Sequence, residues 1–236
     1  MVFEKLEERL ILQGTVEAVT PIHIGSGRGE REIGEVDLPI LKGPSGQPYV
    51  PGSSLKGKVR AEAERIAREK GMPVCSPPDV RNMCGTTKAS QEPDKFCICC
   101  RIFGTAGEVS VASKVKLRDA YPTKEVGETL KRTGIAMDRS TGSVAPRNLY
   151  LIEAVPAGTH FNLEIVAENL TDEELRLLKA ALKSVQDSAL GGFTTRGFGK
   201  VRFNFSKLSK RTAGYYLGEE KEELLEEKAL SKWLEG

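Results

Sequence analysis

The chain has 236 residues, of which 39% are hydrophobic, so it is long and apolar enough to bury a core, which excludes a disordered polypeptide. The formal net charge of +2 comes from 35 Lys and Arg against 33 Asp and Glu, and it does not by itself demand a polyanionic partner. No uninterrupted apolar run approaches the roughly 18 residues of a membrane helix, and the start MVFEKLEERL is charged where a signal peptide is apolar. We expect a soluble, cytoplasmic protein with no membrane partner.

The pattern of apolar residues predicts strands and helices in alternation. The first strand is expected at 10–20, where residues that favour β structure end at a proline. A helix follows at 53–71, with Ser53 or Ser54 as its cap and apolar residues on one face. A capping-box pattern opens a second helix at 171–191. The remaining strands are expected, in chain order, at 109–117, 149–155, 161–167 and 200–205.

Without its insertions, the chain reads strand, helix, strand, strand, helix, strand. This order is typical of the ferredoxin-like (RRM-like) βαββαβ arrangement, an α+β fold. Two long irregular segments, 21–52 and 72–104, interrupt it, and such segments inside a compact domain are usually functional or disordered. Residues 219–236 carry a net charge of −4 and are expected to form a solvated acidic C-terminal helix, which leaves +6 on residues 1–218.

All five cysteines lie within 26 residues of each other. Clustered thiols in an intracellular chain more often bind a metal than form disulfides, although disulfides and free thiols remain alternatives. Cys97 and Cys100 have the C-x-x-C spacing that lets two sulfurs bind one ion, and Cys75 and Cys84 can complete a tetrahedral Zn²⁺ site, with Cys99 pointing elsewhere. Four protein ligands leave no open coordination position, so this zinc would be structural and not catalytic.

The start of the 53–71 helix carries Lys56, Lys58 and Arg60, where the helix dipole disfavours positive charge. A bound anion would resolve that conflict, and the hydroxyls of Ser53 and Ser54 with the first helical amides would complete a phosphate site. The alternative is that these cations simply face solvent. The same segment matches G-x-x-x-x-G-K but lacks the Ser or Thr that binds Mg²⁺ in a P-loop, which excludes a nucleoside triphosphatase.

Three further features could take part in phosphate chemistry. The segment GGFTTRGFGK, residues 191–200, combines four glycines with Arg196, which suits close backbone approach to a ligand, although a helix cap also uses glycine. Asp37 is a carboxylate between apolar neighbours, which could bind Mg²⁺ or position a proton in phosphodiester cleavage, or could only cap a turn. His23 could hydrogen-bond a phosphate or pack beneath its loop.

Four blocks of the sequence together resemble one family. They are His23–Arg60, which contains EVDLP, the segment CICCRIFG at Cys97–Gly104, the segment Ile135–Phe161, and GGFTTRGFGKV at Gly191–Val201. In order and spacing they are similar to the Csm-type backbone subunit of type III CRISPR effector complexes, a member of the RAMP superfamily. The resemblance covers roughly residues 8–206.

The resemblance implies a single RAMP domain over 1–218, made of a ferredoxin-like palm, a projecting β-hairpin-like thumb at about 120–150 and a metal-bearing insertion. Copies of such a subunit stack along a CRISPR RNA together with other type III effector subunits. A loop aspartate, here Asp37, cleaves the paired target RNA at regular intervals with Mg²⁺. The RNA-binding residues on these blocks are His23, Ser53, Ser54, Lys56, Lys58, Arg60, Met137, Arg139, Arg147, Gly191, Gly192, Thr194, Thr195, Arg196, Gly197 and Gly199.

The expected reaction is attack by a target ribose 2′-OH on its adjacent phosphate, which leaves a 2′,3′-cyclic phosphate and a 5′-hydroxyl, with alignment supplied by the thumb. Asp37 would bind Mg²⁺ or orient the 2′-OH. Two other classes are open: a RAMP ribonuclease that processes CRISPR RNA with His23 or His160 as its base, and a non-catalytic RNA-binding filament subunit. In the C-x-x-C-R-x-F-G block Cys99 has no place, which leaves the fourth metal ligand open.

Overall fold

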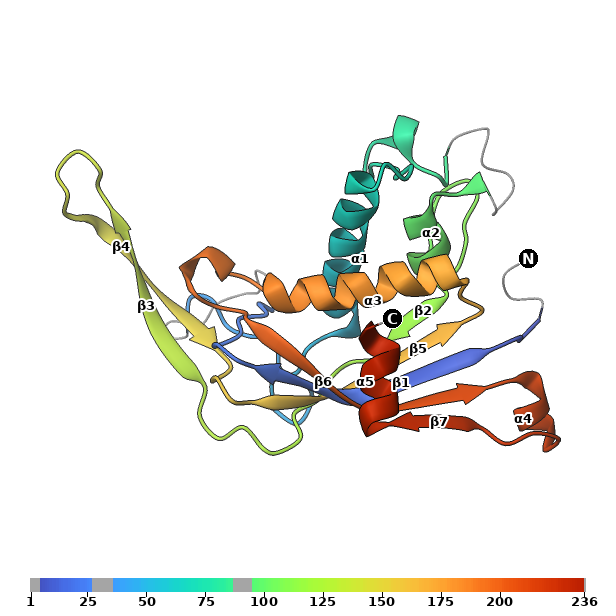
Figure 1. The fold of residues 1–236 in the computed structure, drawn as a ribbon. Helices are drawn as coiled ribbons and strands as arrows, with labels where there is room; N and C mark the ends of the chain where they lie inside the picture. The colour runs from blue at the N-terminus through green and yellow to red at the C-terminus, as the bar shows by residue number, and fades with distance from the viewer. Residues whose placement is uncertain (1–4, 27–35, 87–94, 236) are drawn as a thin grey trace.

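The computed structural model of the chain describes residues 5–26, 36–86 and 95–235 (Figure 1). The expected insertions at 21–52 and 72–104 therefore lie partly outside the described residues. The side chains of Val80 and of residues 145–148 also lie outside them, which includes the guanidinium of Arg147.

A five-stranded antiparallel sheet forms the palm, with the strand order β2-β5-β1-β6-β7. Its strands are β1 (Arg9–Ala18), β2 (Val115–Leu117), β5 (His160–Glu168), β6 (Val201–Arg211) and β7 (Glu223–Glu226). Helix α1 (Gly52–Glu69) connects β1 to β2, and α3 (Asp172–Asp187) connects β5 to β6. Each helix thus joins two parallel strands that are separated by a third, antiparallel one, so the expected ferredoxin-like fold is confirmed.

Helices α1 and α3 pack against each other and against one face of the sheet (Figure 1). Helix α1 contributes Leu55, Val59 and Ala63 to the core, all fully buried, because these residues recur at helical spacing on one side. Helix α3 begins with the predicted capping box between Thr171 and Glu174. Each large apolar side chain buried in this way contributes roughly 1.5–3 kcal/mol to folding.

A separate two-stranded hairpin, which we call the thumb, follows β2 and precedes β5 in the chain and projects from the palm (Figure 1). It consists of β3 (Leu130–Met137) and β4 (Val144–Ala154), so a β-hairpin thumb is confirmed. The strand expected at 149–155 belongs to this hairpin and not to the palm. On the thumb, the apolar side chains of Ile135, Met137 and Leu149 are exposed.

Local expectations fail where distant contacts decide the structure. Helix α1 begins at Gly52, two residues earlier than a Ser53 cap would place it; its N-cap is Pro51, and the Gly52 amide donates to the Asp119 carboxylate at 2.8 Å. The expected strand at 109–117 is reduced to β2. The 72–104 insertion is not wholly irregular, since it contains helix α2 (Ile98–Phe103) and a 3₁₀ turn at Val80–Asn82.

The acidic tail is not one helix, so the prediction for 219–236 is wrong in its first half. After the short helix α4 (Ala213–Leu217), the chain forms β7, which pairs with β6, and only α5 (Glu227–Glu235) is helical. Pairing with the edge of the palm outweighs the helix preference of glutamate here. Among the described residues, no helix is long and apolar enough to cross a membrane.

Candidate functional sites

Asp37 lies at the base of the thumb. Its half-buried carboxylate accepts a hydrogen bond from the backbone N–H of Leu151 on β4 at 2.8 Å. The next residue, Leu38, exchanges backbone hydrogen bonds with Leu151 and Glu153, each at 3.0 Å, and lies parallel to β4. The chain around Asp37 is thereby attached to β4 through a short parallel bridge.

His23 is buried and lies beside β4. Its Nδ1 is 2.7 Å from the backbone oxygen of Glu153, and because a carbonyl oxygen only accepts, Nδ1 donates this hydrogen bond. Its ring packs edge-on against Phe193, with the ring centroids 5.0 Å apart. These contacts make His23 a link between the thumb base and the turn after α3, and they leave Nε2 near Gly25.

The glycine turn, which we define as residues 191–199, packs directly on the backbone at His23. The Gly192 amide donates to the His23 oxygen at 2.8 Å. Gly191 has a φ of +89°, and a Cβ there would lie 2.4 Å from that same oxygen, so only glycine fits. The apex of the turn, a 3₁₀ turn at Thr194–Arg196, is exposed together with Gly197.

Arg196 joins the glycine turn to the thumb. Its guanidinium donates to the Tyr150 hydroxyl and lies over the rings of Tyr150 and Phe193, 5.9 and 5.6 Å from their centroids. Arg132 on β3 donates to the Arg196 backbone oxygen at 3.4 Å and lies over Phe198. The sequence analysis missed Tyr150 and Arg132, although a lone glycine in a strand pattern, at Gly134, indicates a close approach.

The remaining predicted thumb residues lie near its tip. Met137 and Arg139 are exposed, and Met137 ends β3. Asp138 accepts hydrogen bonds from the backbone and hydroxyl of Ser140 and so stabilises the hairpin turn; these bonds lower the pKa of its carboxyl. Arg147 belongs to β4. The tip of the hairpin lies well beyond the palm sheet (Figure 1), and it exposes an apolar and a cationic side chain, Met137 and Arg139.

The residues at the start of α1 that were predicted to bind phosphate differ in exposure and in their partners. Ser53 is exposed and Ser54 is half-buried, and burial together with the Arg60 guanidinium lowers the pKa of the Lys56 ammonium. Lys58 forms an ion pair with Glu62 at 2.8 Å within the helix. Lys58 thus has a partner inside the protein.

Arg60 is directed at the cysteine cluster instead of at the start of the helix. Its Nε pairs with Glu64 at 2.9 Å, its Nη1 donates to the Gly104 oxygen at 3.0 Å, and its Nη2 lies 3.5 Å from the Cys100 sulfur. Burial opposes its charge, but these hydrogen bonds and the nearby thiols raise its pKa overall. Arg60 therefore contacts the cysteine cluster and the chain that follows it.

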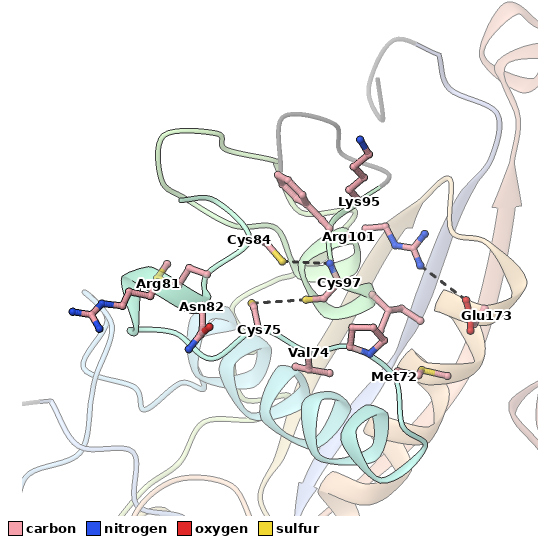
Figure 2. Close-up of a pocket in the computed structure, with 14 residues that line it drawn as sticks. Met72, Val74, Cys75, Arg81, Asn82, Cys84, Lys95, Cys97, Arg101 and Glu173 are labelled. Carbon is pink, nitrogen blue, oxygen red and sulfur yellow. Dashed lines mark hydrogen bonds and ion pairs between the residues drawn. The ribbon is translucent and has the colours of Figure 1, made fainter. Parts of the chain in front are cut away.

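Four cysteine sulfurs converge in the insertion, and Figure 2 shows three of them, those of Cys75, Cys84 and Cys97. The sulfurs of Cys75, Cys84, Cys97 and Cys100 all lie within 4.8 Å of one another, with Cys75–Cys100 at 3.4 Å and Cys75–Cys97 at 3.8 Å. Four Zn–S bonds of about 2.3 Å in a tetrahedron place the sulfurs about 3.8 Å apart, so this donor set fits the ion. Cys99, fully buried, lies outside the group, and no disulfide joins any of the five.

The electrostatics of the cluster favour one thiolate when no ion is bound. A hydrogen bond from Cys100 lowers the pKa of Cys97 to about 4, whereas burial raises the pKa of Cys84 to about 11 and that of Cys99 to about 12. A divalent cation would offset the repulsion among additional thiolates. A cavity of about 740 Å³ opens beside Cys75, Cys84 and Cys97 and is also lined by Arg101 and Glu173 (Figure 2).

Comparison with known proteins assigns the family. The RAMP superfamily model matches residues 15–202. The CRISPR system Cms endoribonuclease Csm3 of Methanothermobacter thermautotrophicus is 32% identical over an alignment 247 positions long, gaps included, that covers 91% of each chain. The protein of the same name from Methanocaldococcus jannaschii is 32% identical over 228 residues, covering 91% of this chain and 86% of its own.

Two solved structures share the fold. One, in a Csm3–Csm4 subcomplex of the type III-A CRISPR-Cas interference complex, has a TM-score of 0.58 at 25% identity and covers 98% of this chain and 96% of its own. The other, Methanopyrus kandleri Csm3, has a TM-score of 0.63 at 24% identity with the same coverages and supports the fold alone. The chain belongs to the RAMP superfamily and, within it, to the Csm3 family.

Proposed function

We propose that this chain is the guide-RNA-binding backbone subunit of a type III CRISPR effector complex and that it cleaves complementary target RNA at regular intervals. The observation that carries the proposal is the position of Asp37, a half-buried carboxylate fixed on the thumb base. The exposed apex of the glycine turn is joined to the same thumb base through Arg196 and Tyr150. A ribose-phosphate chain crossing this face would meet backbone amides, a cation and one carboxylate together.

The role of the chain's residues follows from alignment. In-line cleavage needs the 2′-OH, the phosphorus and the leaving 5′-oxygen on one line, and alignment of this kind supplies a large part of such a barrier. The projecting thumb, with exposed Met137 and Ile135, would hold the guide–target duplex in a bent geometry. Asp37 would then accept or orient the 2′-OH proton, and base identity would be read by pairing with the guide.

A catalytic Mg²⁺ would rely mainly on RNA. Within the described part of the chain, only the cysteines form a group of three or more potential metal ligands. Mg²⁺ is commonly held by one or two carboxylates plus substrate phosphates, so the single carboxylate of Asp37 is compatible with it. Bound there, the ion would neutralise charge developing on the phosphate.

The four-cysteine site would hold Zn²⁺ through Cys75, Cys84, Cys97 and Cys100 and would be structural, since four sulfur ligands leave no position for water. Its partners in the assembly would be the guide and target RNA, further copies of this chain and other effector subunits. The Csm3–Csm4 subcomplex named above supports the last of these.

The test is cleavage mapping of a guide-complementary RNA by the reconstituted complex, with and without Mg²⁺. Asp37→Asn should abolish periodic cleavage while guide and target binding stay within about twofold of wild type. Asp187→Asn, an exposed acid at the end of α3, is the matched control and should cleave normally. Loss of cleavage in His23→Gln with normal cleavage in Asp37→Asn would point to the histidine-based enzyme instead.

A further inference from the structure

Resting on the proposed function, we propose that Tyr150 and Arg196 are positioning residues for cleavage. Together they fix the base of the thumb against the glycine turn, and the thumb base in turn fixes the Asp37 carboxylate. Neither residue needs to touch the reacting atoms. The two residues act by setting the position of the Asp37 carboxylate, so the cleavage rate depends on the orientation of the thumb.

The position of Asp37 is set by β4. The carboxylate accepts from the Leu151 amide, and Leu38 pairs through its backbone with Leu151 and Glu153. The side chain of Glu153 on β4 adds a further bond to this segment, because the Ile40 amide donates to Glu153 Oε2 at 3.1 Å. Any displacement of β4 therefore displaces Asp37 with it.

Strands β3 and β4 pair with each other, β4 also bonds to the backbone at Leu38, and neither strand is part of the palm sheet. Their orientation must then come from contacts at the base, where Figure 1 shows the turn after α3 beside β4. Arg196 provides two of these contacts: its guanidinium reaches Tyr150, and its backbone oxygen accepts from Arg132. The sequence neighbour of Tyr150 is Leu151, the residue that holds Asp37.

The seat of Tyr150 is shaped on both of its sides. Across the hairpin its register partner is Gly134, where an added Cβ would lie 2.3 Å from the tyrosine ring, so the ring lies flat over β3. On the other side Arg196 lies over the ring and donates to the hydroxyl. The turn that carries Arg196 is itself constrained, since Phe193 and Gly197 have φ values of +58° and +89°.

The experiment compares Tyr150→Phe with wild type in the reconstituted complex, at saturating target RNA and in single turnover. We expect the cleavage rate to fall about 10- to 100-fold, the range typical of a small misplacement of a catalytic group, with RNA binding within about twofold. Hydrogen exchange of the Leu151 amide should become faster, because the bond to Asp37 is loosened. Arg196→Lys in the same assay should give a loss that is not additive with that of Tyr150→Phe.

Tyr121→Phe is the matched control, since Tyr121 is exposed and its ring stacks on Tyr49, a residue outside the thumb. It should leave rate, binding and exchange unchanged. If Tyr150→Phe keeps the wild-type cleavage rate and the wild-type hydrogen exchange of the Leu151 amide, the positioning proposal is wrong. Loss of cleavage in Asp37→Asn would still support the proposed function in that case. Weaker binding with an unchanged rate at saturation would also overturn the positioning proposal, because Arg196 and Tyr150 would then act only in holding RNA. Normal cleavage by Asp37→Asn would remove the proposed function itself.

Discussion

The cysteine insertion and the thumb base are organised in opposite ways. In the insertion, four side chains from separate points of the chain meet within 4.8 Å, and the backbone between them is largely irregular. At the thumb base, Asp37 and His23 are positioned by backbone pairing with β4 and the glycine turn. A site made of side-chain ligands depends on what binds it, whereas one made of backbone pairings depends on how neighbouring strands are oriented.

The largest expected effect follows from removing one ligand of the insertion. Cys97→Ser should reduce bound metal from one ion per chain to none and lower the free energy of unfolding by several kcal/mol, because metal binding and folding are linked. Metal content by mass spectrometry and chemical denaturation measure the two. Cys99→Ala is the control, because Cys99 is buried but lies outside the cluster, and it should keep its metal. Full metal content in Cys97→Ser would contradict the assigned ligand set.

A smaller effect is expected at helix α1, whose Arg60 contacts the insertion. Arg60→Met should weaken metal binding about tenfold, since groups that contact a ligand commonly change affinity by that factor, and should leave guide binding nearly unchanged. Competition with a chelating dye measures the first and filter binding the second. Arg65→Met, an exposed arginine on the same helix, should change neither. Weaker guide binding with normal metal affinity in Arg60→Met would mean that Arg60 binds RNA, as the sequence predicted, and does not support the metal site.

The smallest effect concerns acid stability at the thumb base. Burial alone would raise the pKa of Glu153, but hydrogen bonds from Lys42, Thr129 and the Ile40 amide lower it overall. A carboxyl whose pKa is lowered on folding stabilises the protein above its unfolded value of about 4.3, and the contribution disappears as the pH falls through the folded pKa.

Wild type should therefore be more stable than Glu153→Gln at pH 7, and the difference should shrink below pH of about 4. Chemical denaturation across pH 3–7 provides the measurement, with Glu125→Gln as an exposed control. A difference that stays constant over this range would mean that the charge of Glu153 does not stabilise the base of the thumb.

The sequence predicted the elements that depend mainly on interactions between residues close together in the chain. Helical spacing gave α1 and α3, and the C-x-x-C spacing with Cys75 and Cys84 gave the four-sulfur group. What could not be predicted depends on contacts between distant residues. Asp119 replaces the serine cap of α1, and Tyr150 meets Arg196 across 46 positions of sequence.

Composition also misled where pairing decided. Glutamate-rich sequence favours a helix, yet Leu224 and Leu225 lie opposite Ser209 and Leu208 in the β6–β7 ladder. The 72–104 insertion concealed α2 because that helix has only six residues and begins beside Cys97. Asp37 was identifiable as a candidate, but its attachment to β4 was not, since nothing near it in sequence specifies that partner.

Strand β7 has a consequence for solubility. It covers the edge of the palm at β6 with only four residues, Glu-Leu-Leu-Glu, and the opposite edge, β2, has only three. An unpaired edge strand can pair with a strand of another molecule and so lead to aggregation, whereas short edge strands flanked by charged residues resist such pairing. A chain proposed to accumulate in many neighbouring copies is thus protected against joining them through its sheets, the route that would end in aggregates.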